Sequence, residues 1–145
     1  MVVRLTRILR IIGQTLLLLC LVLIAYFSLC KIASGIAEVT GDKFMHSTAY
    51  AALGFSMYLS FMPLEKKVGK EKDMNIHLSN SHTFIILKLF FYGLAYGLLM
   101  EILQSFVGRS CSLMDLAADG IGLIVGFATC YLFLGFVNKL FSYLP

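Results

Sequence analysis

The side chains able to do chemistry gather in two short segments of an otherwise apolar chain. The first segment holds Asp42, Lys43, His46 and Tyr50. The second holds Glu101, Gln104, Arg109, Asp115 and Asp119. An ionisable group at mid-depth in a bilayer costs roughly 2.5 to 3.5 kcal/mol on insertion scales, so such groups are usually kept for a function. We therefore treat the two segments as the candidate site.

Residues three or four positions apart share one face of an α-helix. The candidate residues follow this spacing in three groups, which are Asp42 with His46 and Tyr50, Glu101 with Gln104, and Asp115 with Asp119. Each group therefore predicts a helix with one polar edge. The Gly93/Gly97 and Gly122/Gly126 pairs remove side-chain bulk from two of these helices. We expect those two helices to pack closely at the glycines.

The residue types suit proton transfer and the binding of an anion. Histidine and carboxylates are common general acids and bases, and the catalytic candidates are His46, Glu101 and Asp115. Arg109 has the planar fork that suits a phosphate or carboxylate group. The ligand-binding candidates are Asp42, Lys43, Tyr50, Gln104, Arg109 and Asp119. The alternative is a static polar network that only fixes helix packing.

The sequence predicts no metal and no cofactor, because one histidine among scattered carboxylates lacks the ligand spacing of a zinc site. The four cysteines, Cys20, Cys30, Cys111 and Cys130, contain no CxxC pair. We expect most of them to be apolar packing residues. A disulfide between Cys30 and Cys111 stays open, because both approach the same predicted membrane boundary.

The elements that must position the site are membrane helices. Hydrophobic residues make up 59% of the 145 residues and the mean hydropathy is +0.88, well above the composition of a soluble domain. A spanning helix needs about 20 mostly apolar residues. Four stretches qualify, at about 11–30, 44–62, 83–107 and 113–136. The sequence therefore predicts one all-α domain over 1–145, a four-transmembrane-helix bundle with a polar cytoplasmic loop at about 64–82.

The orientation follows from the basic residues near the helix ends, because positively charged loops stay in the cytoplasm. With the amino terminus inside, nine basic residues are cytoplasmic: Arg4, Arg7, Arg10, Lys66, Lys67, Lys70, Lys72, Lys88 and Lys139. Three are outside: Lys31, Lys43 and Arg109. We therefore expect cytoplasmic termini and an extracytoplasmic site. The first apolar run is too long for a cleaved signal, and the net charge of +4 suits anionic lipid rather than nucleic acid.

The chain from Asp42 to Gly126 resembles the VanZ-like family of bacterial membrane proteins. Its first signature is matched by Asp42, Lys43, His46, Tyr50, Leu53 and Gly54. The second is matched by Glu101, Gln104, Arg109, Asp115, Gly122 and Gly126. Position 119 departs from the family, which generally has Asn there. The resemblance implies a place in the bacterial cytoplasmic membrane and a link to resistance against the glycopeptide teicoplanin.

Three functions fit these residues. The first is a site that binds, and in an enzyme would process by hydrolysis or group transfer, an anionic cell-envelope molecule such as a lipid-linked or wall precursor. The second is a small proton-coupled transporter or flippase. The third is a noncatalytic accessory membrane protein. The residues alone leave the ligand and the oligomeric state open.

Overall fold

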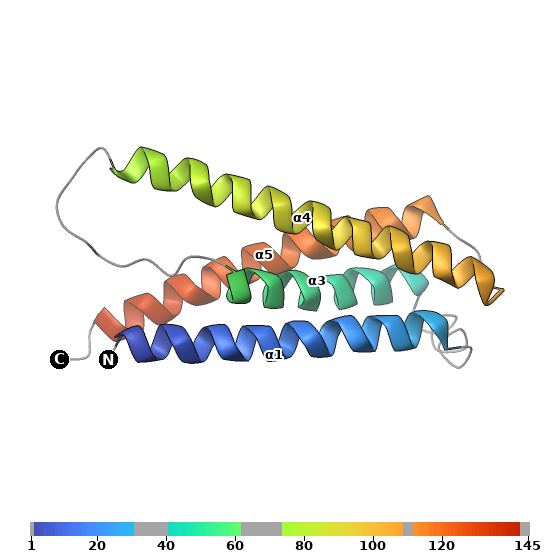
Figure 1. Cartoon of the computed structure of the whole chain (residues 1–145), viewed down its shortest axis with the longest axis horizontal. Coiled ribbons are helices and arrows are strands. Elements are labelled where there is room, and N and C mark those ends of the chain that lie inside the picture. Colours follow the sequence, from blue (N-terminus) through green and yellow to red (C-terminus); the bar gives the residue numbers. More distant parts are fainter. Residues whose placement is uncertain (1, 31–40, 62–73, 109–111, 143–145) are drawn as a thin grey trace.

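The computed structural model describes residues 2–30, 41–61, 74–108 and 112–142, and it is helical through these ranges. Its helices are α1 (Val2–Leu29), α3 (Asp42–Phe61), α4 (Met74–Phe106) and α5 (Leu113–Ser142). Consecutive helices run in opposite directions, so α1 begins and α5 ends at the same end of the bundle (Figure 1). The predicted all-α class is confirmed over the described ranges.

The helices are longer than their apolar stretches. α1 begins at Val2 rather than near residue 11, and α5 continues to Ser142 rather than ending near residue 136. α4 begins at Met74, so residues 74–82 are helical instead of belonging to the predicted loop. Hydropathy marks only the apolar part of a helix, whereas backbone hydrogen bonds continue through polar turns. The rest of that predicted loop lies almost wholly outside the described residues.

Three described helices are long and apolar enough to cross a membrane, over Thr6–Leu29, His82–Phe106 and Leu113–Val137. Large apolar side chains are exposed on each of them; examples are Leu18 at 65%, Phe91 at 64% and Leu132 at 68%. Such surfaces suit contact with lipid tails. Three of the four predicted spans are therefore supported by length and composition. α3 does not belong to this set, because its serines, tyrosines and His46 lower its hydropathy.

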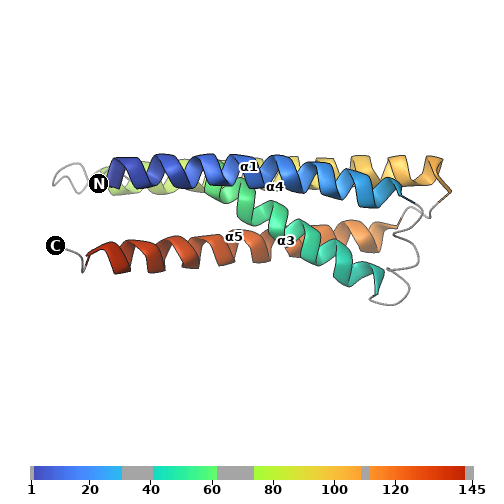
Figure 2. The same cartoon turned by 90° about the horizontal axis from the view of Figure 1, so that it is seen from below.

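α3 is the central helix of the bundle. It packs most extensively against α5 and next against α1, and it crosses between α1 and α5 in Figure 2. Residues 56–60 are all buried, which means that protein covers every side of the helix there. The hydroxyls of Ser56 and Ser60 donate to the carbonyls of Leu53 and Ser56 at 2.8 and 2.6 Å. The hydroxyls of Ser56 and Ser60 are thus paired inside the protein.

The glycines of α5 face α3 instead of α4. A Cβ atom placed on Gly122 or Gly126 would collide with the backbone carbonyl of Ser47 or Ala51. Gly93 and Gly97 of α4 accommodate side chains of α5, namely Leu123 and Asp119. The expected partner is therefore correct for Gly93 and Gly97, which face α5, and wrong for Gly122 and Gly126, which face α3. The short side chains on this face of α3 allow its backbone to contact α5 closely.

Candidate functional site

The candidate site lies at the end of the bundle where α3 begins, α4 ends and α5 begins (Figure 1). α3 follows Gly41, and α4 ends just before Gly108; these two glycines have φ angles of +80° and +83°. Such left-handed backbone is favourable for glycine and is common where a helix ends. The carbonyl of Gly41 accepts the first backbone bonds of α3, from Phe44 and Met45 at 3.1 and 3.2 Å.

His46 is the centre of the site. Its Nδ1 atom lies 2.9 Å from Oδ1 of Asp119, a hydrogen bond between α3 and α5. Its Nε2 atom lies 4.0 Å from Oε1 of Glu101 on α4. The His46 side chain is 11% exposed and both acids are 1% exposed. Residues far apart in the sequence thus form one buried contact among three helices.

Glu101 also joins the end of α4 to the start of α5. Its Oε2 atom accepts a hydrogen bond from the backbone N–H of Ser112 at 2.9 Å. The Ser112 hydroxyl in turn accepts from the N–H of Met114 at 3.2 Å, as a helix cap does. An acid is unfavourable at the end of its own helix, but here Glu101 meets the favourable amino end of another. Sequence reasoning overlooked Ser112 as a partner, although its place before the helix is typical of a cap.

The site contains buried polar atoms without a hydrogen-bond partner among the described residues. They are Oε1 of Glu101, Oδ2 of Asp119, the Tyr50 hydroxyl and Nε2 of Gln104. A Cβ atom on Gly97 would lie 2.7 Å from Oδ2 of Asp119 and 3.3 Å from the Tyr50 hydroxyl, so the absent side chain leaves room for both groups. An unpaired buried polar group costs about 1 to 3 kcal/mol. The site therefore has capacity for further polar contacts.

Asp115 completes the group of catalytic candidates. It is 4% exposed, and one ligand atom each from His46, Glu101 and Asp115 lie within 4.8 Å of one another. Its position in the first turn of α5 is favourable for an acid. The structure thus brings together all three residues that the sequence selected for proton transfer.

The remaining candidates are less closely associated with this group. Lys43 is exposed near the start of α3. Asp42 begins α3, but its side chain is outside the described part of the structure. Arg109 and Cys111 lie outside the described residues, so the anion-binding arginine stays a prediction, whereas the disulfide left open for Cys30 is not formed, because Cys30 is a free thiol. Cys20, Cys30 and Cys130 are free thiols.

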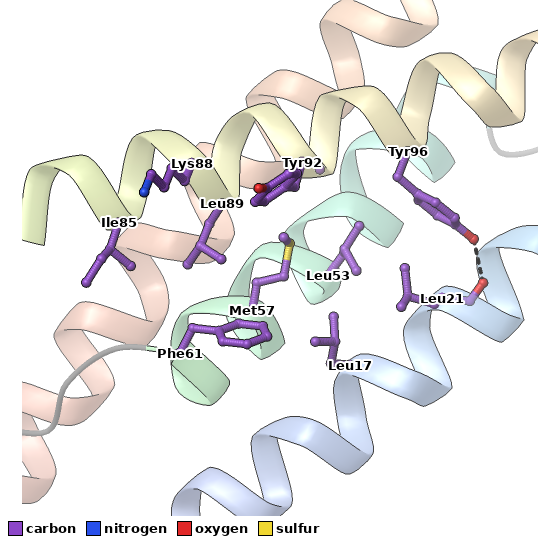
Figure 3. A pocket seen from close by; sticks show the side chains of 11 residues that line it. Leu17, Leu21, Leu53, Met57, Phe61, Ile85, Lys88, Leu89, Tyr92 and Tyr96 are labelled. Atoms are coloured by element: carbon purple, nitrogen blue, oxygen red, sulfur yellow. Dashed lines mark hydrogen bonds between the residues drawn. The ribbon is translucent and has the colours of Figure 1, made fainter.

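An apolar cavity of about 500 Å³ lies between α1, α3 and α4 (Figure 3). Its lining residues are Leu17, Leu21, Leu53, Met57, Phe61, Ile85, Lys88, Leu89, Tyr92, Gly93 and Tyr96. The Tyr96 hydroxyl donates to the Leu21 carbonyl at 2.6 Å and joins α4 to α1. Gly93 lines the cavity, and Gly97, one helical turn further along α4, borders Asp119. The cavity and the polar site are therefore neighbours.

Comparisons of the chain with protein-family models, with curated proteins and with solved structures found no match. The resemblance to the VanZ-like family therefore stays a prediction.

Proposed function

We propose that this chain is an integral membrane protein that binds an amphipathic cell-envelope molecule at one end of its bundle. The polar headgroup would lie at His46 and its neighbouring acids, and the hydrocarbon chain would lie in the apolar cavity. The convergence of His46, Glu101 and Asp119 from three helices carries this proposal. A network that served only packing would be expected to pair its polar atoms, whereas among the described residues Glu101 and Asp119 each have a buried oxygen without a hydrogen-bond partner.

In this proposal all four helices cross the bilayer. α3 has 20 residues, which at about 1.5 Å per residue gives about 30 Å, the thickness of the hydrocarbon core. Its polar residues are compatible with this position because α1 and α5 pack against it. The basic residues near the helix ends then place the termini in the cytoplasm and the site on the extracytoplasmic side. A bacterial cytoplasmic membrane is the location that the VanZ-like resemblance implies.

The cavity supports a ligand with a hydrocarbon chain. Its volume falls within the range of about 300 to 1,000 Å³ that is typical of small-molecule sites. Most of its lining is aliphatic or aromatic, and its one charged residue is Lys88. Leu53 lines the cavity and Tyr50, one turn away on α3, belongs to the polar site. A single amphipathic molecule would therefore be able to contact both.

The residues of the polar site favour a headgroup whose negatively charged part lies at the edge of the site. Lys43 is exposed near the start of α3, and Arg109 follows α4 in the sequence. Both would bind phosphate or carboxylate oxygens, Arg109 through two parallel N–H groups. Deeper in the site, His46 held by Asp119 is able to accept a proton from water or a hydroxyl group. Hydrolysis or group transfer on the headgroup is the reaction class that this arrangement would catalyse.

The proposal is tested by lipid binding to the purified protein in detergent, measured by native mass spectrometry. The probes are a polyprenyl phosphate and the uncharged polyprenol of the same length. We expect preferential retention of the phosphate, and at least about tenfold weaker binding in His46→Gln and in Leu89→Trp, which fills the cavity. Glu71→Gln, in the segment between α3 and α4, is the control. Equal retention of both lipids, or unchanged binding in both variants, would contradict the proposal.

A further inference from the structure

We propose that the polar site binds a divalent transition-metal ion through His46, Glu101 and Asp115. These residues come from α3, α4 and α5, and each offers one ligand atom. The three atoms lie within 4.8 Å of one another. In a tetrahedral zinc site, with bonds of about 2.0 to 2.2 Å, neighbouring ligand atoms lie about 3.3 Å apart. Small side-chain rotations would therefore close this group around an ion.

The contact between Asp119 and His46 supports the same conclusion independently. A histidine that binds a metal usually has its second ring nitrogen hydrogen-bonded to a carboxylate or carbonyl, which fixes the orientation of the ring. Here Oδ1 of Asp119 lies 2.9 Å from Nδ1 of His46, and Nε2 faces Oε1 of Glu101 at 4.0 Å. Nε2 of the imidazole is thus already turned toward Glu101, one of the other two ligands. Asp119 has a positioning role in this arrangement.

The charge balance also favours a cation. Glu101, Asp115 and Asp119 are all buried. Among the described residues, Glu101 and Asp119 each form an ion pair with His46. Oε1 of Glu101 lies 4.0 Å from Nε2 of His46 and is buried without a hydrogen-bond partner in the described part of the chain. Burying an uncompensated carboxylate is costly. A divalent ion would supply both the missing partner and two positive charges.

The ligand types narrow the choice of metal. One imidazole nitrogen with two carboxylates suits Zn²⁺ or Mn²⁺, whereas Mg²⁺ and Ca²⁺ prefer oxygen ligands alone. Three protein ligands leave a coordination position for water or for an oxygen of a ligand. That position would let an acidic site hold an anionic headgroup. With the ion bound, Nε2 of His46 would be a metal ligand instead of the proton acceptor of the metal-free site. The binding of a headgroup to the ion rests on the proposed function, whereas the binding of the metal itself does not.

The first experiment measures metal uptake by protein purified with a tag that lacks histidine. After treatment with EDTA, the protein is dialysed against Zn²⁺ or Mn²⁺ and the bound metal is counted by mass spectrometry. We expect one ion per chain. Glu101→Gln and Asp115→Asn should lose this ion, and Asp119→Asn should bind about 10 to 100 times more weakly. Glu71→Gln is the matched control and should bind like the wild type.

A second measurement does not depend on the folding of a variant in the acids. Pulsed EPR of the Mn²⁺-loaded protein should detect a coupled imidazole nitrogen. The signal should persist after His77→Gln and His82→Gln, which remove the other two histidines, and should disappear after His46→Gln. Absence of stoichiometric uptake, uptake unchanged in Glu101→Gln and Asp115→Asn, or a nitrogen signal that survives His46→Gln would overturn the metal site. Lipid binding by EDTA-treated protein separates this failure from failure of the proposed function.

Discussion

At the scale of single residues, the two oxygens of Glu101 have different surroundings. Oε2 accepts from the backbone of Ser112, while Oε1 faces His46 without a hydrogen bond. The first contact fixes the helix ends, and the second leaves capacity for a ligand. The two oxygens of Asp119 differ in the same way, because Oδ1 contacts His46 and Oδ2 has no hydrogen-bond partner among the described residues. The same two carboxylates therefore join helices and have oxygens available for the proposed ligand.

Sequence reasoning selected residues that the structure brings together, but it could not supply their pairing. The i,i+4 spacing places Asp42 and His46 on one face of α3, and the structure adds a contact of His46 with Asp119 on another helix. Contacts within a helix follow from spacing, but contacts between helices depend on rotation and register. The proposed metal ligands were not predicted as a metal site for the same reason. Each of these residues lies on a different helix, so no short sequence motif contains all three.

Gly97→Ala tests whether the position of Asp119 matters. The added Cβ would lie 2.7 Å from Oδ2 of Asp119 and would displace that carboxylate. The displaced atom is at the end of a flexible side chain and is able to move. The loss in the free energy of unfolding should therefore be smaller than that of a typical overpacked core, which is about 1 to 3 kcal/mol. Binding of the polyprenyl phosphate should nevertheless fall about tenfold or more.

The control for this variant is Gly135→Ala, because a Cβ on Gly135 meets nothing within 4 Å. It should bind lipid like the wild type. Wild-type binding in Gly97→Ala as well would mean that Asp119 does not form part of the binding site.

At the scale of helices, hydropathy located the three apolar spans but missed the burial of α3. Its apolar stretch was expected at about 44–62, and the helix spans Asp42–Phe61. Nothing in its composition showed that protein would surround Ser56 and Ser60. The extra turns of α4 were missed because Asn75 and Asn80 are polar. Helix length and helix burial are set by packing and hydration as well as by apolar content.

Gly122→Ala tests the contact between α3 and α5. Its Cβ would collide with the backbone carbonyl of Ser47 and lie 3.0 Å from the backbone nitrogen of Ala51. Backbone atoms cannot rotate away, so the two helices must separate. We expect a loss of about 1 to 3 kcal/mol in the free energy of unfolding in detergent. Gly135→Ala, on the same helix, should be neutral or gain up to about 1 kcal/mol. Equal stability of the two variants would contradict the packing.

At the scale of the whole molecule, the antiparallel order of helices determines where the site lies. The starts of α3 and α5 and the end of α4 share one end, opposite to the start of α1 and the end of α5 (Figure 1). If every helix crosses the membrane, the termini lie on one side and the site lies on the other. If α3 failed to cross, the termini would lie on opposite sides.

Reporter fusions distinguish these topologies. We expect a fluorescent reporter after Pro145 to mature in the cytoplasm, and alkaline phosphatase there to be inactive, because most basic residues near helix ends are on that side. A cysteine at Phe106, which is 81% exposed near the site, should react with an impermeant thiol reagent added outside the cell. The native cysteines are replaced beforehand. Active phosphatase after Pro145 would contradict the proposed orientation.

The central claim is that His46 lies in a pocket that receives a ligand. Nitrogen-15 NMR of histidine in the protein reconstituted into liposomes tests it most directly, with the His46 signals assigned from their loss in His46→Gln. We predict that polyprenyl phosphate shifts the His46 imidazole signals, that the uncharged polyprenol shifts them less, and that His77 and His82 stay unchanged. His46 signals that do not move while the lipid is bound would contradict the account.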